Sequence, residues 1–172
     1  MSVTYYAACT LDGFIARTDG GVDWLTPFQE SGDDYGFTDF FAKTDSLVMG
    51  SATYEFMLGH PPWMAPDKPS WVFTKRDLEP AAPNVTLTED EPSQVMEAIH
   101  EQQLQNTWLV GGGQLAESFR AQGLITDYVI SMVPLLLGEG ISLFARGSTL
   151  EPLKLVSSES YPSGIVQLSY TV

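Results

Sequence analysis

Alternation between strand-like and helix-like segments is the feature that most constrains the fold of this chain. Four segments with apolar residues every three or four positions, 34–42, 52–58, 93–103 and 114–122, predict helices. They are interspersed with apolar, β-branched or aromatic runs that predict strands: VTYYAACTL, DSLVMG, PSWVFT, NVTLT, NTWLVG, DYVISMVPLLL, LKLVSSESY and GIVQLSYTV. This order predicts an α/β fold with helices on both faces of a sheet, and the last two runs, joined through YPSG, predict an antiparallel hairpin that closes it.

Length and composition indicate one compact domain, residues 1–172. Hydrophobic residues make up 44% of the 172 and charged residues 17%, without repeats or low-complexity stretches, which excludes the disordered and fibrous classes. Cys9 is the only cysteine, and His60 and His100 have no carboxylate at ligand spacing, so neither a disulfide nor a metal site is expected. The chain has no recognisable signal peptide and no apolar run that could span a bilayer, so a cytoplasmic location without membrane contact is expected.

Acidic residues dominate the charge, with 22 Asp and Glu against 8 Lys and Arg and a formal net charge of −14. A surface that binds nucleic acid or anionic lipid is therefore not expected, and the predicted partner is a small molecule. An anionic ligand would meet a repulsive long-range field. Any phosphate site must therefore be built locally, from backbone N–H groups and a few bases.

Three consecutive glycines, Gly111 to Gly113 in NTWLVGGGQLAESF, separate a predicted strand from a predicted helix. In one interpretation they only turn the chain, although one glycine normally suffices. In a second, Gly111, Gly113 and Ala116 match the dinucleotide fingerprint G-x-G-x-x-A, but the motif comes late in the chain and Asp127 precedes the next strand instead of ending it. In a third, bare N–H groups at a helix N-terminus bind phosphate whatever the topology, because they carry about half a positive charge.

Two further strands end in groups that can donate hydrogen bonds. DSLVMGSATYEF places Gly50 and small polar residues at a helix start, where they could also be an ordinary helix cap. PSWVFTKRD ends in Lys75 and Arg76, which could also be a solvated pair. If the strands are parallel, these turns and the glycines meet at one edge of the sheet, where open α/β sheets bind ligands.

Six motifs, taken in order, resemble the dihydrofolate reductase-like superfamily. They are LDGFIA, DW at 23–24, MGSATYE, VFTKR, LVGGGQLAESF and PLLLGEGISLF. From about Val3 to the C-terminus, the chain resembles the reductase domain of bifunctional riboflavin-biosynthesis deaminase-reductases and its stand-alone bacterial relatives. The resemblance implies a three-layer α/β/α sandwich with a central mixed, mostly parallel sheet. It also implies an NADPH-dependent reductase that transfers hydride to a pterin-like or ribosylaminopyrimidine-like heterocycle.

The same resemblance implies which residues hold NADPH. They are the Ala8 backbone and Ile15 at the nicotinamide, Gly50, Ser51 and Thr53 at the pyrophosphate and adenosine ribose, Thr74, Lys75 and Arg76 at the 2′-phosphate, and Gly111, Gly112, Gly113, Gln114 and Leu115 around the pyrophosphate. Relatives often join the first two of the three glycines by a cis peptide. The common family pattern Gly-Arg-x-Thr here reads Gly-Ser-Ala-Thr, so a charged clamp is missing and the choice between NADPH and NADH is open.

The residues that would bind the substrate are harder to identify from the sequence. Asp34 is the candidate for the acid that serves the substrate, with Phe37 three residues further on, although Glu30, Asp33 and Asp34 also fit solvated acids at a helix entrance. Tyr6, Trp24, Phe37 and Val110 are expected to line the substrate pocket, with plain core packing as the alternative. A rival function is a nucleotide-binding or ligand-sensing module that has kept the fold without turnover.

The C-terminal run GIVQLSYTV predicts an edge strand with one apolar face. Val166, Leu168, Tyr170 and Val172 alternate with more polar residues. An apolar strand at a sheet edge invites aggregation unless it is paired or covered. Together with the family resemblance, this face predicts a homodimer; the alternative is that helices of the same chain cover it.

Overall fold

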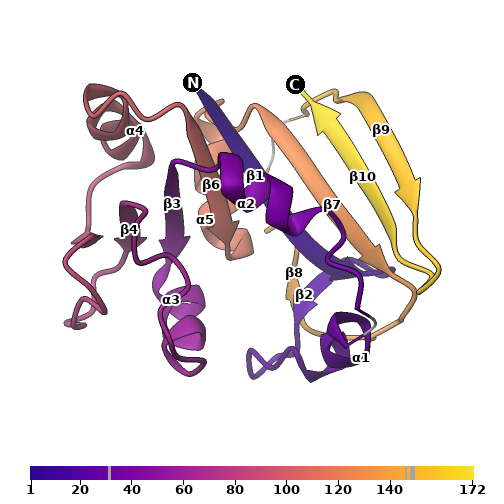
Figure 1. The fold of residues 1–172 in the computed structure, drawn as a ribbon. Coiled ribbons are helices and arrows are strands. Elements are labelled where there is room, and N and C mark those ends of the chain that lie inside the picture. Colours follow the sequence, from indigo (N-terminus) through magenta and orange to yellow (C-terminus); the bar gives the residue numbers. More distant parts are fainter. Residues whose placement is uncertain (31, 146, 148–149) are drawn as a thin grey trace.

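A mixed sheet forms the centre of the protein (Figure 1). The computed structural model describes residues 1–30, 32–145, 147 and 150–172. Within these residues, the eight strands of the central sheet lie in the order β5-β4-β3-β6-β1-β7-β10-β9. Their bounds are β1 Ser2–Thr10, β3 Ser46–Gly50, β4 Ser70–Phe73, β5 Val85–Thr88, β6 Asn106–Gly111, β7 Asp127–Val133, β9 Lys154–Ser160 and β10 Val166–Thr171. The pairs from β5 to β7 are parallel, and β10 is antiparallel to both β7 and β9. The predicted mixed sheet and antiparallel C-terminal hairpin are confirmed.

Helices cover both faces of the sheet. Their bounds are α1 Thr26–Gln29, α2 Phe37–Lys43, α3 Ser51–Leu58, α4 Pro92–Glu101 and α5 Gly113–Ala121, with a 3₁₀ turn η1 at Asp23–Leu25. Side chains of α2 and α3 pack with Leu47, Met49 and Trp108 on one face, whereas α4 and α5 pack with Val48 and Leu109 on the other. Figure 1 shows α2 in front of the sheet and α5 behind it. The inner strands are apolar throughout because both of their faces are buried, and the predicted three-layer α/β/α sandwich is confirmed.

Two predicted elements are shorter than expected. Helix α2 begins at Phe37 instead of Asp34, because Tyr35 (φ 55°) and Gly36 (φ 75°) have left-handed backbone conformations that no helix continues through. Strand β7 ends at Val133 rather than extending through PLLL, because Pro134 has no N–H for the ladder.

The structure also contains a small two-stranded β-ribbon that the sequence analysis did not predict. Strands β2 (Phe14–Ala16) and β8 (Ile141–Ser142) pair antiparallel. In Figure 1 this ribbon lies near the lower end of the sheet, the end at which β3 leads into α3.

The Asp12 carboxylate ties the turn between β1 and β2 to the loop that follows β7. It accepts hydrogen bonds from the Thr10 hydroxyl at 2.5 Å, the Leu137 N–H at 3.0 and 3.1 Å, and the Gly138 N–H at 2.7 Å. The Thr10 hydroxyl, followed by the Gly138 N–H, lowers the pKa of Asp12 from 3.8 to about 2. All these partners donate to the charged form, so the folded state favours ionised Asp12.

We predict that Asp12→Asn destabilises the protein in a pH-dependent way. Because the pKa of Asp12 is lower in the folded state, its stabilisation is complete above the unfolded-state pKa of 3.8 and is lost as the pH falls through about 2. Urea unfolding should show a gap in stability between wild type and variant that is constant from about pH 7 to 5 and smaller at about pH 3. A gap of the same size at pH 3 and pH 7 would contradict this role.

Candidate cofactor and substrate site

Three parallel strands end side by side and bring the predicted cofactor residues together. In the order β4-β3-β6, Gly50 is paired with Phe73 and Met49 with Gly111. The residues after β4, the start of α3 and the glycine turn therefore lie at the same edge of the sheet. The contact is close: a Cβ built on Gly50 would lie 3.8 Å from both the Gly111 carbonyl oxygen and the Gly112 nitrogen.

The three glycines differ in what the fold requires of them. Gly111 has φ 129°, a conformation that L side chains rarely adopt, and the Gly111–Gly112 peptide is cis, as the resemblance implied. A Cβ on Gly113 would collide with the Ser142 carbonyl oxygen and lie 3.1 Å from that of Leu143. A Cβ on Gly112 would meet nothing closer than Ile15 Cδ1 at 3.8 Å and Thr53 Oγ1 at 3.9 Å. The backbone conformation thus demands Gly111 and packing demands Gly113, whereas Gly112 would accept a methyl group at ordinary contact distances.

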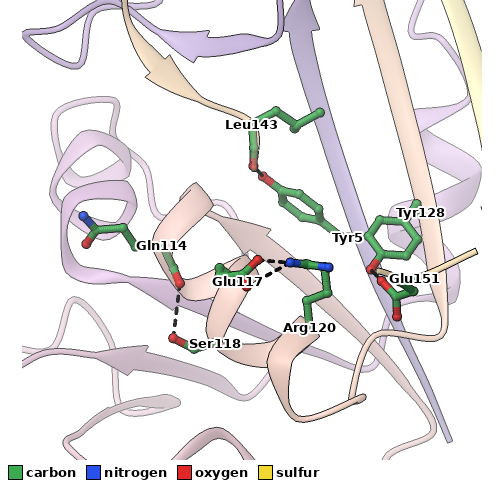
Figure 2. Close-up of polar contacts among 8 residues, drawn as sticks. All are labelled: Tyr5, Gln114, Glu117, Ser118, Arg120, Tyr128, Leu143 and Glu151. Atoms are coloured by element: carbon green, nitrogen blue, oxygen red, sulfur yellow. Dashed lines mark hydrogen bonds and ion pairs between the residues drawn. The ribbon is translucent and has the colours of Figure 1, made fainter. Parts of the chain in front are cut away.

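The segment that constrains Gly113 is anchored from several directions (Figure 2). The buried Tyr5 hydroxyl donates to the Leu143 carbonyl oxygen at 2.9 Å, and the Tyr128 hydroxyl donates to Glu151 Oε2 at 2.7 Å. On α5, Glu117 and Arg120 form an ion pair at 2.8 Å whose side chains are only 17% and 13% exposed. The two tyrosine contacts hold Leu143 against β1 and Glu151 against β7, and the first of them helps to fix the backbone that passes over Gly113.

Two helix N-termini at this edge lack side-chain caps. Helices α3 and α5 begin after the extended glycines Gly50 and Gly112, and neither has a side-chain hydrogen bond at its N-cap. Helix α4, by contrast, satisfies its own first turn with a capping box between Glu91 and Gln94. The first N–H groups of α3 and α5 are therefore available to an anion, and the helix dipoles favour one there.

Several of the expected polar and basic groups lie on α3 or contact it. Thr53 Oγ1 faces Gly112, and Ser51 opens α3. The Thr74 hydroxyl accepts a hydrogen bond from the Arg76 N–H at 2.9 Å, which folds the chain back after β4. Lys75 and Arg76 are exposed, and Arg76 forms an ion pair with Glu55 of α3.

Of the two residues expected at the nicotinamide, Ala8 lies on β1 and Ile15 lies on β2. Ile15, on β2, reaches Gly112, as its Cδ1 position shows. Ala8 pairs with Ser131 of β7 and packs against the cluster around Trp24 and Val133. Ile15 is thus adjacent to the glycine turn, and Ala8 is adjacent to the cluster that contains Trp24.

The predicted substrate residues fall into two groups. Tyr6, Phe37 and Val110 belong to one cluster, in which the Tyr6 ring lies 5.9 Å from that of Phe37 and 6.5 Å from that of Trp108. Trp24 packs in a separate cluster. Its indole nitrogen is buried and has no hydrogen-bond partner among the described residues. The structure therefore brings three of the four residues together and leaves Trp24 apart from them.

Asp34 binds the first turn of α2, whose N-cap residue is Gly36. Its side chain is exposed and accepts hydrogen bonds from the Gly36 N–H at 3.0 Å and the Thr38 N–H at 3.1 Å. Hydrogen bonds from Thr38 and then Gly36 lower the pKa of Asp34, so it is ionised at neutral pH and has no proton to donate. This geometry favours the helix-entrance interpretation of the acid.

A polar cluster on the sheet escaped the sequence analysis. Gln167 Nε2 lies 3.0 Å from each of the Tyr6 hydroxyl, the Ser131 hydroxyl and the Tyr35 carbonyl oxygen. The available signal was Gln167 itself, a long amide in an otherwise apolar terminal strand, but its partners lie far away in the sequence.

Among the described residues there is no group of three or more His, Cys, Asp or Glu placed to hold a metal ion. Within that same part of the chain, no helix combines the length and apolar character needed to cross a bilayer.

Comparison with known proteins places the chain in a family. The model of the RibD C-terminal domain matches residues 1–167. The uncharacterised Bacillus subtilis protein YwjB is 31% identical over 166 residues, which cover 96% of this chain and 94% of YwjB. The riboflavin biosynthesis protein RibD of Corynebacterium ammoniagenes is 32% identical over 163 residues, covering 86% of this chain and 47% of RibD.

A solved structure supports the same relationship. A protein of Shewanella sp. PV-4, provisionally named for riboflavin biosynthesis, superposes with a TM-score of 0.88 at 26% identity, with 99% of this chain and 98% of the other covered. The fold is the dihydrofolate reductase-like fold of RibD reductase domains. The family match over nearly the whole sequence and the shared architecture lead to one conclusion: this chain belongs to the RibD C-terminal domain family.

Proposed function

We propose that this protein is an NADPH-dependent reductase that transfers hydride to a pterin-like or ribosylaminopyrimidine-like heterocycle. The observation that carries the proposal is the pair of uncapped helix N-termini, α3 and α5, whose N-cap residues Gly50 and Gly112 lie close together at one edge of the sheet. The residues present fit a dinucleotide. Local N–H dipoles provide an anion site in a chain of net charge −14, where the long-range field would repel phosphate.

Each part of the site would hold a different part of the cofactor, which supplies a hydride when bound. The first turns of α3 and α5 bind the pyrophosphate, with the Ser51 and Thr53 hydroxyls beside them. Lys75 and Arg76 attract the 2′-phosphate by charge-assisted hydrogen bonds. Ile15 and the backbone of Ala8 border the nicotinamide, and the cluster of Tyr6, Ser131 and Gln167 offers polar groups to a heterocycle.

Names of relatives support the substrate class. The names of both the Corynebacterium RibD protein and the Shewanella protein refer to riboflavin biosynthesis. The chain spans 47% of that RibD protein, so the activity of the whole protein is not carried over. What we propose for this chain is the reductase step alone.

A second candidate function is nucleotide binding without turnover. Two observations favour it: Ser51 replaces the charged clamp of the family pattern, and Asp34 is engaged as a helix cap. The two functions differ in one measurable property, the oxidation of bound cofactor by a substrate.

We expect turnover. NADPH should bind with a change in its fluorescence, and its absorbance at 340 nm should fall when the ribosylaminopyrimidine of riboflavin synthesis or dihydrofolate is added. A matched reaction without protein corrects for spontaneous oxidation. Binding of NADPH without oxidation by any heterocycle tested would favour the binding module instead.

We also predict that Gly112→Ala blocks the cofactor while the fold survives. A methyl group there meets only ordinary contacts at 3.8 and 3.9 Å, but it would stand at the N-cap of α5, where we propose that the pyrophosphate binds. The affinity for NADPH should fall by at least about tenfold, the loss of about one hydrogen bond to a charged group. The matched control is Gly113→Ala, whose methyl collides with backbone and should cost about 1–3 kcal/mol of stability. Wild-type affinity in folded Gly112→Ala would place the cofactor elsewhere.

We further propose that the protein is a homodimer. A cavity of about 470 Å³ opens on the face of β7 and β10 opposite Gln167, lined by Ile130, Met132, Leu143, Phe144, Leu153 and Leu168 among others. All seven residues of the neighbouring strand β9 are exposed, including Leu155 and Val156 at 53% and 63%. The same apolar face of a second copy of the chain would cover these exposed residues and bury them from water.

Light scattering at micromolar concentration tests the dimer. We expect a mass about twice the 18.9 kDa of one chain, and stronger association in added salt, because the acids of both subunits repel each other. Leu168→Asp should lower the mass while the circular dichroism spectrum stays unchanged. A mass of one chain at both low and moderate salt would contradict the proposal.

A further inference from the structure

The adenosine end of the proposed cofactor site contains a carboxylate that binds its arginine. Arg76 Nη1 lies 3.0 Å from Glu55 Oε1, and Arg76 Nη2 lies 2.5 Å from Glu55 Oε2. This is the bidentate geometry in which a guanidinium group also binds phosphate. Glu55 and a 2′-phosphate would therefore compete for the same face of Arg76.

The topology places Glu55 at this site. It lies on α3 one turn after Ser51, and α3 begins directly after β3. Because Gly50 pairs with Phe73, the residues that follow β4 run beside the start of α3. The ion pair joins these two segments across the place where the resemblance puts the adenosine ribose and its 2′-phosphate.

Resting on the proposed function, we propose that Glu55 restrains the preference for NADPH over NADH. The 2′-phosphate carries nearly two negative charges. Lys75 and Arg76 offer two positive charges, but the Glu55 carboxylate neutralises one of them. NADH has a ribose hydroxyl in place of this phosphate, and a carboxylate is the group that accepts a hydrogen bond from it in many dinucleotide sites. Glu55 thus disfavours one cofactor and can favour the other.

The pair can exchange partners. The side chains of Arg76 and Glu55 are 53% and 43% exposed, so solvent screens their attraction and the pair contributes little to stability. NADPH can displace Glu55 from Arg76, but the displaced carboxylate remains near the phosphate and repels it. Removing the charge of Glu55 should therefore affect binding much more than folding.

The test compares the dissociation constants of NADPH and NADH, measured by cofactor fluorescence at about 0.1 M salt, where charges more than about 10 Å apart are largely screened. In Glu55→Gln, we expect the preference for NADPH, the ratio of the NADH to the NADPH constant, to rise about tenfold, as for one charge removed a few ångströms from a phosphate. Arg76→Ala should lower the same ratio. The matched control is Glu97→Gln, which removes an equal charge from an exposed position on α4, on the opposite side of the sheet; its ratio should equal that of wild type.

The outcomes separate this inference from the proposed function. If both cofactors bind and Glu55→Gln leaves their ratio unchanged, Glu55 does not set the preference, although the reductase proposal stands. A change of equal size in Glu97→Gln would show an effect of net charge and would likewise overturn the inference. If neither cofactor binds wild type or the variants, the proposed function fails and the inference with it. Unchanged melting temperatures confirm that the variants are folded.

Discussion

The parallel pairing of β3 with β6 is the constraint on which the rest of the candidate site depends. Each of these strands ends in glycine and leads directly into a helix. Because parallel neighbours end at the same edge, the two helix N-termini point to one place. Two sets of free N–H groups and two helix dipoles then act together on an anion, which neither helix achieves alone. In so acidic a chain, this concentration of local dipoles is the physical basis of the proposed phosphate site.

Contacts from distant segments make that arrangement rigid. Asp12 holds the loop after β7 through the Leu137 and Gly138 N–H groups, Tyr5 holds Leu143, and Tyr128 holds Glu151. The Ser142 and Leu143 carbonyl groups lie against Gly113, so the start of α5 cannot shift without disturbing them. A preorganised donor set binds an anion more tightly than a mobile one, because less ordering is needed on binding.

At the proposed adenosine end of the site, acidic neighbours offset part of the positive charge of the basic residues. The family's clamp is replaced by Ser51, and Arg76 is already engaged by Glu55. Most of the proposed cofactor affinity therefore rests on backbone N–H groups, which do not distinguish NADPH from NADH. The proposed discrimination between the two cofactors depends on a few side chains whose effective charge is set by their neighbours.

Local sequence determined much of this protein. The alternation of β and α segments predicts the layered sheet, because residue periodicity follows which faces are buried, and YPSG with its flanking runs predicts the C-terminal hairpin. The ordered motifs predict the family, and the glycine block marks a place where backbone must approach something closely. Each of these features arises from residues that are neighbours in the chain, so a pattern in the sequence can reveal them.

Tertiary structure decided what each of those residues does. The third glycine is required because the Ser142 and Leu143 backbone crosses it, and the first is required because its φ is positive, whereas the second would accept a methyl group. Asp34 became a helix cap because left-handed residues delay the start of α2, and Arg76 met Glu55 only because β4 pairs beside β3. These outcomes depend on distances between residues far apart in the chain. Such distances are set by sheet order and register, which no local pattern contains.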